Sequence, residues 1–418
     1  MGMAGSALGK PLATQLPAFD RAAILNYPAL PAEITDRIFG TKTPKAINPA
    51  RPDSLLSQDW ALSAIGFFKV FTPLVQPING AVQACSPEVV VAVVDTGIDY
   101  THQELKDNIW INSGETGEWK ATTPTQLAKA AGGCHDKSCN GIDDDANGFV
   151  DDVVGWDFVH DVALPFDTHG HGTHIAGIIS AAAANGFGIT GVCPHATIMP
   201  LKYYDSSGLG YNNLNNTVKA IHYAVKMGAQ IINYSGGGAD PSPSEKAAIE
   251  EAERKGILFI AAAGNDGHDN TQTPYFPASY GLDNIISVAS INQENHLLPS
   301  SNFGHTVNVA APGLSILSSL PDGRMGTMSG TSQATAFVTG AAALLSSQLK
   351  GHGSAFDFRK VKRWITEGVR PMNGNDKKQL LAGGILSLPK ALQIEKEELK
   401  KSSAPEIALQ SRSSGRRN

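Results

Sequence analysis

The segment EVVVAVVDTGID, residues 88–99, decides the fold of this chain. It begins with a run of β-branched apolar residues and reaches Asp95-Thr96-Gly97 without a polar residue at alternate positions. A continuous apolar run of this kind is typical of a strand that is buried on both faces of a parallel sheet. We therefore expect a strand at residues 88–95, with Asp95 at its carboxyl end.

Similar apolar blocks follow along the chain and alternate with helical stretches. The alternation predicts an α/β fold, with a doubly wound, mostly parallel sheet and helices on both faces. Ligands of such sheets bind at the carboxyl ends of the strands, which is where Asp95 stands. The further strands are expected at residues 196–201, 229–234, 257–262, 285–289 and 307–310, and the helices at residues 174–184, 214–227, 244–255 and 331–349.

Composition and charge restrict the class of protein. The 418 residues are 42% hydrophobic and 17% charged, as in globular proteins that bury a sizeable core. The net charge of −6 argues against binding to nucleic acid or to an anionic membrane surface, because both require a concentrated basic surface. No uncharged apolar run is long enough for a membrane-spanning helix. The sequence thus predicts neither a nucleic-acid partner nor a membrane span.

Three short segments carry residues suited to nucleophilic catalysis. Asp95 ends the first strand, His171 lies in HGHGTHIAG at residues 169–177, and Ser332 lies in SGTSQAT at residues 329–335. A serine hydroxyl is a poor nucleophile near neutral pH unless an imidazole takes its proton. The imidazole in turn needs a buried carboxylate that fixes its tautomer. At the start of an Ala-rich helix, Ser332 also has free backbone N–H groups beside it, which can face a developing oxyanion.

Each of these segments also fits a simpler role. Asp-Thr-Gly after a strand can be a capped turn, His171 can be a helix-start residue without chemistry, and Ser332 can be an N-cap. In the chain order Asp, His, Ser, however, they match the subtilisin arrangement of a catalytic triad and not that of chymotrypsin. The combination therefore favours a serine hydrolase.

The segments VVDTGID, HGHGTHIAGI and SGTSQAT resemble the three signatures of the subtilases, and the resemblance covers about residues 53–390. It implies a subtilisin-like fold and a serine endopeptidase that cleaves protein or peptide substrates through an acyl-enzyme. It also implies that Asn265, in AAAGN at residues 261–265, donates to the oxyanion together with the Ser332 N–H. A Gly-Asn turn that leaves a strand is the alternative interpretation of Asn265.

Two rival functions fit parts of this pattern. A catalytically silent, calcium-dependent binding protein could use the same fold, although binding alone requires neither the triad nor an oxyanion donor. A serine hydrolase that acts on esters or lipids is the other rival. It lacks support because no G-x-S-x-G elbow surrounds Ser332.

The resemblance further implies a cleft that binds an extended peptide as an added strand. Two ordinary Gly-rich loops are the alternative. In TPYFPA, residues 273–278, Tyr275 stands where the P1 pocket would end, and an inward ring would leave a shallow pocket that prefers small P1 residues. The residues expected to contact substrate are Ser207, Gly208, Leu209, Ser235, Gly236, Gly237, Ala263 and Gly264.

The stretch NGIDDDANGFVDD, residues 140–152, gathers carboxylates around a central glycine. Clustered carboxylates repel one another unless a hard cation lies among them, and Ca²⁺ takes about six to eight oxygen ligands. The opening D-x-D-x-N-G matches an EF-hand loop, although the closing Glu is missing. We expect calcium here, with a solvated acidic turn as the alternative. The predicted ligands are Asp143, Asp145, Asn147, the Phe149 carbonyl, and Asp151 or Asp152.

A second calcium site is implied by the resemblance. The loop NGFGITG, residues 185–191, is similar to the loop that forms the tight calcium site of the family, and Glu104 stands where the family often has Asp. If either ion binds only the folded chain, calcium removal lowers the melting temperature. The implied ligands are Glu104, the Asn185 side chain, and the carbonyls of Ala183, Phe187 and Ile189.

We divide the chain into an N-terminal extension or short pro-segment (1–52), a catalytic domain (53–392) and a flexible C-terminal tail (393–418). The extension is rich in Pro and Ala and lacks periodicity, so it is a candidate inhibitory pro-segment. The tail is charged and then rich in Ser and Arg, a composition typical of disorder.

Two compartments fit the sequence. The opening MGMAGSALGK lacks the basic-then-apolar pattern of a secretory signal. The four cysteines allow two disulfides in three connectivities, with a small Cys134–Cys139 loop as one option, or four free thiols; they are Cys85, Cys134, Cys139 and Cys193. We expect a secreted or periplasmic protein whose signal is absent from this chain, with an intracellular protein as the alternative.

Overall fold

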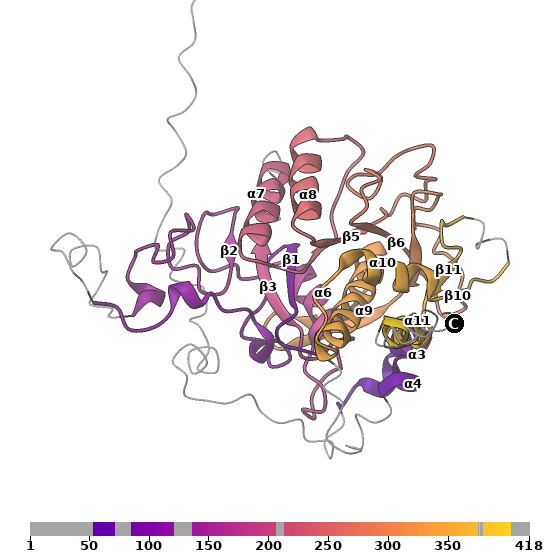
Figure 1. The fold of residues 1–418 in the computed structure, drawn as a ribbon, viewed down its shortest axis with the longest axis horizontal. Coiled ribbons are helices and arrows are strands. Elements are labelled where there is room, and N and C mark those ends of the chain that lie inside the picture. The colour runs from indigo at the N-terminus through magenta and orange to yellow at the C-terminus, as the bar shows by residue number, and fades with distance from the viewer. Residues whose placement is uncertain are drawn as a thin grey trace, which may run out of the picture.

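The computed structural model describes residues 53–71, 85–120, 136–205, 213–374, 376 and 379–402. These residues build a central sheet with helices on both faces (Figure 1). Its strands are β1 (Val90–Asp95), β2 (Trp156–Asp157), β3 (Thr197–Lys202), β4 (Ile231–Tyr234), β5 (Leu258–Ala262), β6 (Ile285–Ile291), β7 (Val309–Pro312), β10 (Val369–Pro371) and β11 (Gly384–Leu386).

The strands form one nine-stranded sheet in the order β10-β11-β7-β6-β5-β4-β1-β3-β2. Neighbouring strands are parallel, except that β10 and β11 are antiparallel. In this register Asp95 at the end of β1 lies beside Lys202 of β3, and Val94 lies beside Tyr234 of β4. The carboxyl ends of the central strands therefore meet at one edge, where a site can form.

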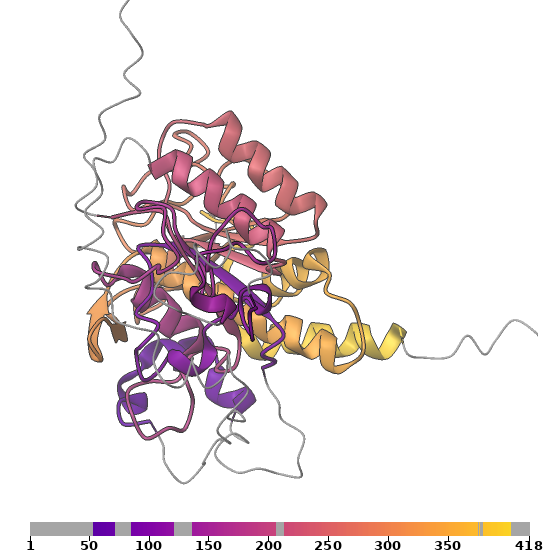
Figure 2. The ribbon, with the colours of Figure 1, turned by 90° about the vertical axis from the view of Figure 1, so that its left-hand side faces the viewer.

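Two pairs of helices cover the faces of the sheet (Figures 1 and 2). Helices α7 (Asn213–Lys226) and α8 (Pro243–Arg254) lie on one face, and α6 (His171–Ser180) and α9 (Thr331–Gly351) lie on the other. Along β1, the side chains of Val91 and Val93 join the core under α6 and α9, whereas Ala92 and Val94 join the core under α7 and α8. This burial on both faces explains why the strand is apolar at successive positions.

The other elements pack around this framework. Helices α10 (Phe358–Glu367) and α11 (Leu388–Ser402) lie against α9, and α3 (Trp60–Ala64) packs on α4 (Phe67–Phe71), which contacts α11. An antiparallel ribbon of β8 (Ile316–Leu320) and β9 (Arg324–Met328) packs on α6 through β8. The short 3-10 helices are η1 (Leu56–Gln58), η3 (Lys106–Asn108), η4 (Ser113–Glu115) and η6 (Lys137–Cys139).

The doubly wound α/β fold predicted from the sequence is confirmed, and the predicted strands coincide with β1 and β3 to β7 within about two residues. The C-terminal boundary differs from the prediction. Helix α11 continues past residue 393 to Ser402, so the first part of the predicted tail is helical. Although the segment is rich in charged residues, the helix has a face that packs on the core: Leu392 and Leu399 contact the core, and Glu395 is buried.

A disulfide joins Cys85, which precedes β1, to Cys193, which precedes β3, with a Cα–Cα distance of 5.5 Å. Cys139 is also disulfide-bonded. The predicted small loop involves Cys134, which lies outside the described residues. None of the described helices has a stretch long and apolar enough to cross a bilayer.

Candidate active site

The sheet edge brings together the three segments that the sequence singled out. Asp95 is the last residue of β1 and only 3% exposed. His171 is the first residue of α6 and Ser332 is the second residue of α9, and these two helices pack on each other. A strand end and two helix starts therefore place a carboxylate, an imidazole and a hydroxyl in the same region of the molecule.

Asp95 and His171 are joined by a direct hydrogen bond. The Nδ1 atom of His171 lies 2.7 Å from Oδ1 of Asp95, and the backbone N–H of Thr96 donates to the same oxygen at 2.8 Å. Burial alone would lower the pKa of His171, but the charge and hydrogen bond of Asp95, together with the charge of Asp167, outweigh it and raise the pKa above its ordinary value. The imidazole is thus oriented by a buried carboxylate while its side chain stays 23% exposed.

Ser332 lies in the first turn of α9, where backbone N–H groups lack intrahelical acceptors. Its hydroxyl donates to the carbonyl oxygen of Ser235, which follows β4, at 3.1 Å. Gly330 precedes the helix with φ of +151°, a conformation that favours glycine. The chain therefore turns sharply into α9, and Ser332 comes beside the end of β4.

Asn265 follows β5 and reaches the same helix start. Its Oδ1 accepts from the backbone N–H of Thr331 at 2.9 Å and from the Thr331 hydroxyl at 3.1 Å. With its oxygen held in this way, the exposed side chain has its amide nitrogen left to donate to a ligand. The Asn265 amide and the N-terminus of α9 are thus adjacent donors of the kind that stabilises an oxyanion.

Comparison with known proteins agrees with this geometry. The model of the subtilase family matches residues 86–380, which is more than half of the chain. The chain belongs to the subtilase family. It is 34% identical over 258 residues to the thermophilic serine proteinase of Bacillus sp. (strain AK1), an alignment that covers 62% of this chain and 52% of that protein. It is 42% identical over 196 residues to thermitase of Thermoactinomyces vulgaris, covering 47% of this chain and 68% of that protein.

A solved structure, that of the prenylagaramide maturation protease PagA, has a similar fold with a TM-score of 0.53 and 25% identity. The similarity covers 74% of this chain and 94% of that one. The subtilase described here spans about half of the length of the Bacillus relative that it matches. These similarities establish the family and the fold of the chain.

Five of the eight residues predicted to contact substrate lie within the described part of this subtilase. Ser235, Gly236 and Gly237 follow β4, and Ala263 and Gly264 follow β5. The other three lie outside the described residues: Ser207, Gly208 and Leu209. Because β4 and β5 are parallel neighbours, the two described segments leave the same edge of the sheet side by side.

Tyr275 lies against both of these segments. A Cβ atom placed on Gly237 would come within 2.5 Å of the Tyr275 ring, and one placed on Gly264 would come within 3.0 Å. The next residue, Phe276, exchanges two backbone hydrogen bonds with Gly238, at 2.9 and 2.7 Å. The ring is therefore held between the segment after β4 and the segment after β5.

In the acidic loop, the structure gathers only part of the predicted ligand set. Carboxylate oxygens of Asp143 and Asp145 lie within 4.8 Å of each other and of a carboxylate oxygen of Glu115. Burial, helped by the charges of Asp152 and Asp144, raises the pKa of Glu115 to about 7. Glu115 Oε2 is buried and has no hydrogen-bond partner among the described residues, so the three carboxylates fit a hard cation.

The remaining predicted ligands of this loop have other contacts. Both carboxylate oxygens of Asp151 accept from the backbone N–H of Gly141, at 3.2 and 3.1 Å. The buried Asp152 accepts from the Tyr223 hydroxyl and from the side-chain amides of Asn112 and Asn147. Phe149 packs its ring on Tyr223 with centroids 4.9 Å apart, and its carbonyl stays a predicted ligand.

At the second loop, the buried Glu104 accepts from the Asn185 side chain at 2.7 Å and from the backbone N–H of Ile189 at 3.0 Å. Burial raises the pKa of Glu104 to about 8, and the nearby charge of Asp53 adds a smaller effect in the same direction. The loop therefore wraps around the buried Glu104 carboxylate, whose charge a cation would neutralise. The carbonyls of Ala183, Phe187 and Ile189 stay predicted ligands.

Sequence reasoning missed Glu115 and Asp53. Glu115 lies 28 residues before Asp143 and belongs to no motif; it is the last residue of η4 and meets the acidic loop by accepting from the backbone N–H groups of Asp144 and Asp145. Asp53 is buried, and its carboxylate accepts from the backbone N–H groups of Ala184 and Asn185 and from the Thr190 hydroxyl. A local pattern carries no signal for contacts across 131 residues.

Proposed function

We propose that this subtilase is a serine endopeptidase whose catalytic triad is Asp95, His171 and Ser332. The observation that carries the proposal is the 2.7 Å contact between His171 Nδ1 and the buried Asp95 carboxylate. A carboxylate at Nδ1 favours the tautomer that leaves Nε2 able to accept a proton, as a general base requires. The subtilase relatives support the same activity.

In the proposed mechanism, His171 removes the hydroxyl proton of Ser332 while Oγ attacks the carbonyl carbon of the scissile peptide bond. His171 then gives this proton to the leaving amine, and an acyl-enzyme remains. A water molecule deprotonated by His171 releases the acyl group and restores Ser332. In the free protein the Ser332 hydroxyl donates to the carbonyl oxygen of Ser235. Catalysis therefore requires the Ser332 side chain to rotate until its hydroxyl points at His171.

The oxyanion of the tetrahedral intermediate is held by the Asn265 amide and the Ser332 backbone N–H. Thr331 supports this role because it occupies Oδ1 of Asn265 and thereby orients the amide. Loss of one such donor costs roughly 10²–10³-fold in turnover in subtilisin. We take Asn265→Ala to have an effect of the same order here.

The position of Tyr275 supports a preference for small P1 residues. The scissile carbonyl has to reach Ser332 and Asn265, so the P1 side chain enters between the segments after β4 and β5. The Tyr275 ring is in contact with Gly237 and Gly264, which belong to those two segments. We propose that the ring occupies the space that a large P1 side chain would need.

We propose that calcium binds at one or both acidic loops. The first site is supported by Glu115 Oε2, which has no hydrogen-bond partner in the described part of the chain and lies near Asp143 and Asp145. The second is supported by the buried Glu104, whose pKa the charge of Asp53 helps to raise. Bound Ca²⁺ would screen repulsion among these carboxylates and hold the loops in place.

A secreted or periplasmic location remains our proposal, with an intracellular one as the alternative. The Cys85–Cys193 disulfide supports it, because disulfides persist mainly in oxidising compartments. We also propose that residues 1–52, which lie outside the described residues, act as an inhibitory pro-segment.

Hydrolysis of casein and of a labelled peptide tests the proposed activity. Ser332→Ala and His171→Ala are expected to lower kcat by roughly 10⁴–10⁶-fold. Ser346→Ala is the matched control, because this buried serine lies in the same helix and donates only to the Ala342 carbonyl. Activity that survives Ser332→Ala, or a wild-type chain that is folded, loaded with calcium and still inactive, would contradict the proposal.

A further inference from the structure

Asp167 is a fully buried carboxylate four residues before His171, and the triad does not use it. Its Oδ1 accepts from the Thr96 hydroxyl at 2.9 Å and from the backbone N–H groups of His169 and Gly170 at 2.9 and 2.8 Å. Its Oδ2 accepts from the backbone N–H of Thr173 at 2.9 Å and from the Thr173 hydroxyl at 2.6 Å. Five donors therefore converge on one side chain.

These contacts replace an ordinary helix cap. The N-cap residue of α6 is Gly170, which has no side chain to bind the free N–H groups of the first turn. Asp167 binds the N–H groups of Gly170 and Thr173 instead, and Thr96 accepts from the N–H of Gly172 at 2.9 Å. The backbone on both sides of His171 is thus fixed, directly or through Thr96.

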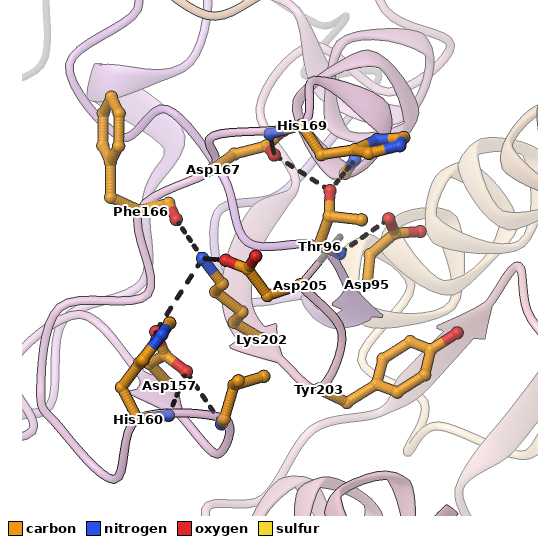
Figure 3. Close-up of polar contacts among 12 residues, drawn as sticks. Asp95, Thr96, Asp157, His160, Phe166, Asp167, His169, Lys202, Tyr203 and Asp205 are labelled. Carbon is orange, nitrogen blue, oxygen red and sulfur yellow. Dashed lines mark hydrogen bonds and ion pairs between the residues drawn. The ribbon is translucent and has the colours of Figure 1, made fainter. Parts of the chain in front are cut away.

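Thr96 links Asp167 to the proposed triad (Figure 3). Its backbone N–H donates to Asp95 Oδ1 at 2.8 Å, and its hydroxyl donates to Asp167 Oδ1 at 2.9 Å. Asp95 accepts from His171 through that same Oδ1 atom. One residue therefore sets the position of the His171 helix start relative to the carboxylate that His171 binds.

The segment that carries Asp167 is itself anchored from the neighbouring strand. Lys202, at the end of β3, is fully buried and donates from Nζ to the carbonyl of Phe166 at 3.1 Å (Figure 3). Nζ also lies 3.0 Å from a carboxylate oxygen of Asp205 and 3.9 Å from one of Asp157. Because Lys202 lies beside Asp95 in the sheet, this ion cluster ties the Asp167 segment to the strands that carry the site.

We propose that Asp167 is a positioning residue for the general base. It holds the first turn of α6 on Thr96, and so keeps the His171 imidazole on Asp95 and aimed at Ser332. This inference rests on the proposed triad. Because a misplacement of about 1 Å costs roughly 10²-fold in rate, loss of the Asp167 contacts is expected to act on kcat more than on KM.

The negative charge of Asp167 has a second measurable effect, on the pKa of His171. The titratable groups that face His171 are Asp95 on β1, Asp167 and His169 before α6, and His174 one turn further along the helix. The negative charges of Asp95 and Asp167 both favour the imidazolium. When Asp167 becomes neutral, the pKa of His171 falls, and the acid limb of kcat/KM moves to lower pH. The acid limb therefore reports the charge of Asp167, whereas kcat reports the position of the imidazole.

The experiment compares wild type, Asp167→Asn and Thr96→Val by kcat, KM and the pH profile of kcat/KM on one peptide substrate. Asp167→Asn is expected to lower kcat by roughly 10²-fold, to change KM less than about threefold, and to shift the acid limb to lower pH. Thr96→Val is expected to lower kcat without this shift, because the Asp167 charge remains. A wild-type kcat in folded Asp167→Asn would overturn the inference, whether or not the acid limb moves.

Asp59→Asn is the matched control, because Asp59 is a buried aspartate that caps α3 by accepting from the Leu62 N–H at 3.0 Å. It is expected to leave kcat and the acid limb unchanged, because Asp59 contacts neither Thr96 nor the first turn of α6 among the hydrogen bonds of the described residues. If Asp167→Asn does not fold, Thr96→Val decides, and an unchanged kcat there counts against the positioning role. A wild-type Ser332 that does not react with a fluorophosphonate would reject the triad itself, which is a different outcome.

Discussion

At the scale of single residues, opposing effects act on the protonation of His171. Burial favours the neutral ring, whereas the charge and hydrogen bond of Asp95 and the charge of Asp167 favour the imidazolium and raise the pKa above 6.5. A general base has to be neutral, so activity is lost as the pH falls through this raised pKa. We expect the acid limb of kcat/KM in the wild-type enzyme above pH 6.5. A pH profile measures it, and a limb below that value would contradict this account.

Tyr275 makes the second prediction at this scale. Tyr275→Ala removes the ring that lies against Gly237 and Gly264, and the space that it leaves can accept a large P1 side chain. We expect kcat/KM for Phe or Leu at P1, relative to Ala at P1, to rise roughly 10-fold or more. A set of peptides that differ only at P1 measures this ratio.

Tyr280→Phe is the matched control for Tyr275→Ala, because the Tyr280 hydroxyl binds Ser242 and Glu245, which lie outside the two glycine segments. Its P1 profile should equal that of the wild type. Faster wild-type cleavage after Phe or Leu than after Ala would show that Tyr275 does not restrict the pocket.

At the scale of elements, helix α11 contains a buried carboxyl group, Glu395, whose ionisation is unfavourable. Glu395 is 3% exposed, burial raises its pKa to about 8, and its Oε1 has no hydrogen-bond partner among the described residues. The folded chain therefore holds a proton that the unfolded chain releases near pH 4.5. The contribution of this group to stability is fully present below that pH and is lost as the pH rises toward about 8.

Glu395→Gln should remove this penalty. We expect its free energy of unfolding to exceed that of the wild type by on the order of 2 kcal/mol at pH 8, and by little at pH 5. Urea unfolding at the two pH values measures the difference. As a control, the exposed Glu397→Gln on the same helix should show no such pH-dependent gain. A gain for Glu395→Gln that is equal at both pH values would show that the buried charge is not its cause.

The elements also show what the sequence could predict. Strands β1 and β3 to β7 were predictable because each is an apolar run buried on both faces, and Asp95, His171, Ser332 and Asn265 stand at element ends that short motifs mark. The short strands β10 and β11 were not predicted, since β11 depends on pairing with the distant β7 more than on a local pattern. The β8–β9 ribbon is a local hairpin, and it was not predicted because Ser, Gly, Thr and Arg interrupt its apolar residues. Glu115 and Asp53 were missed because their contacts, like that of β11, join distant parts of the chain.

At the scale of the whole molecule, two kinds of cross-link tie distant parts of the chain together. The Cys85–Cys193 disulfide closes a loop with a sequence separation of 108 that contains β1, β2 and α6. The proposed calcium sites join Glu115 to the acidic loop and Asp53 to the loop around Glu104. The disulfide does not depend on metal, so calcium removal should weaken the folded state without opening this link.

We expect EDTA to lower the melting temperature and Ca²⁺ to restore it. When free calcium is 100 times its Kd, one bound ion adds about 2.7 kcal/mol to the free energy of unfolding. Asp143→Asn and Glu104→Gln should each remove part of this gain, which separates the two sites. Asp322→Asn, at an exposed ion pair with Arg324, should leave it intact. Differential scanning calorimetry measures the effect, and a melting temperature indifferent to calcium would reject both sites.

The most direct test of the central claim is fluorophosphonate labelling of the folded, calcium-loaded protein, followed by mass spectrometry of the peptide that contains Ser332. The Asp95–His171–Ser332 assembly predicts one label per chain, on Ser332, lost in Ser332→Ala and in His171→Ala, and retained in the Ser346→Ala control. An unlabelled Ser332 in folded and fully processed protein would contradict it and would favour a catalytically silent binding protein on the subtilase fold.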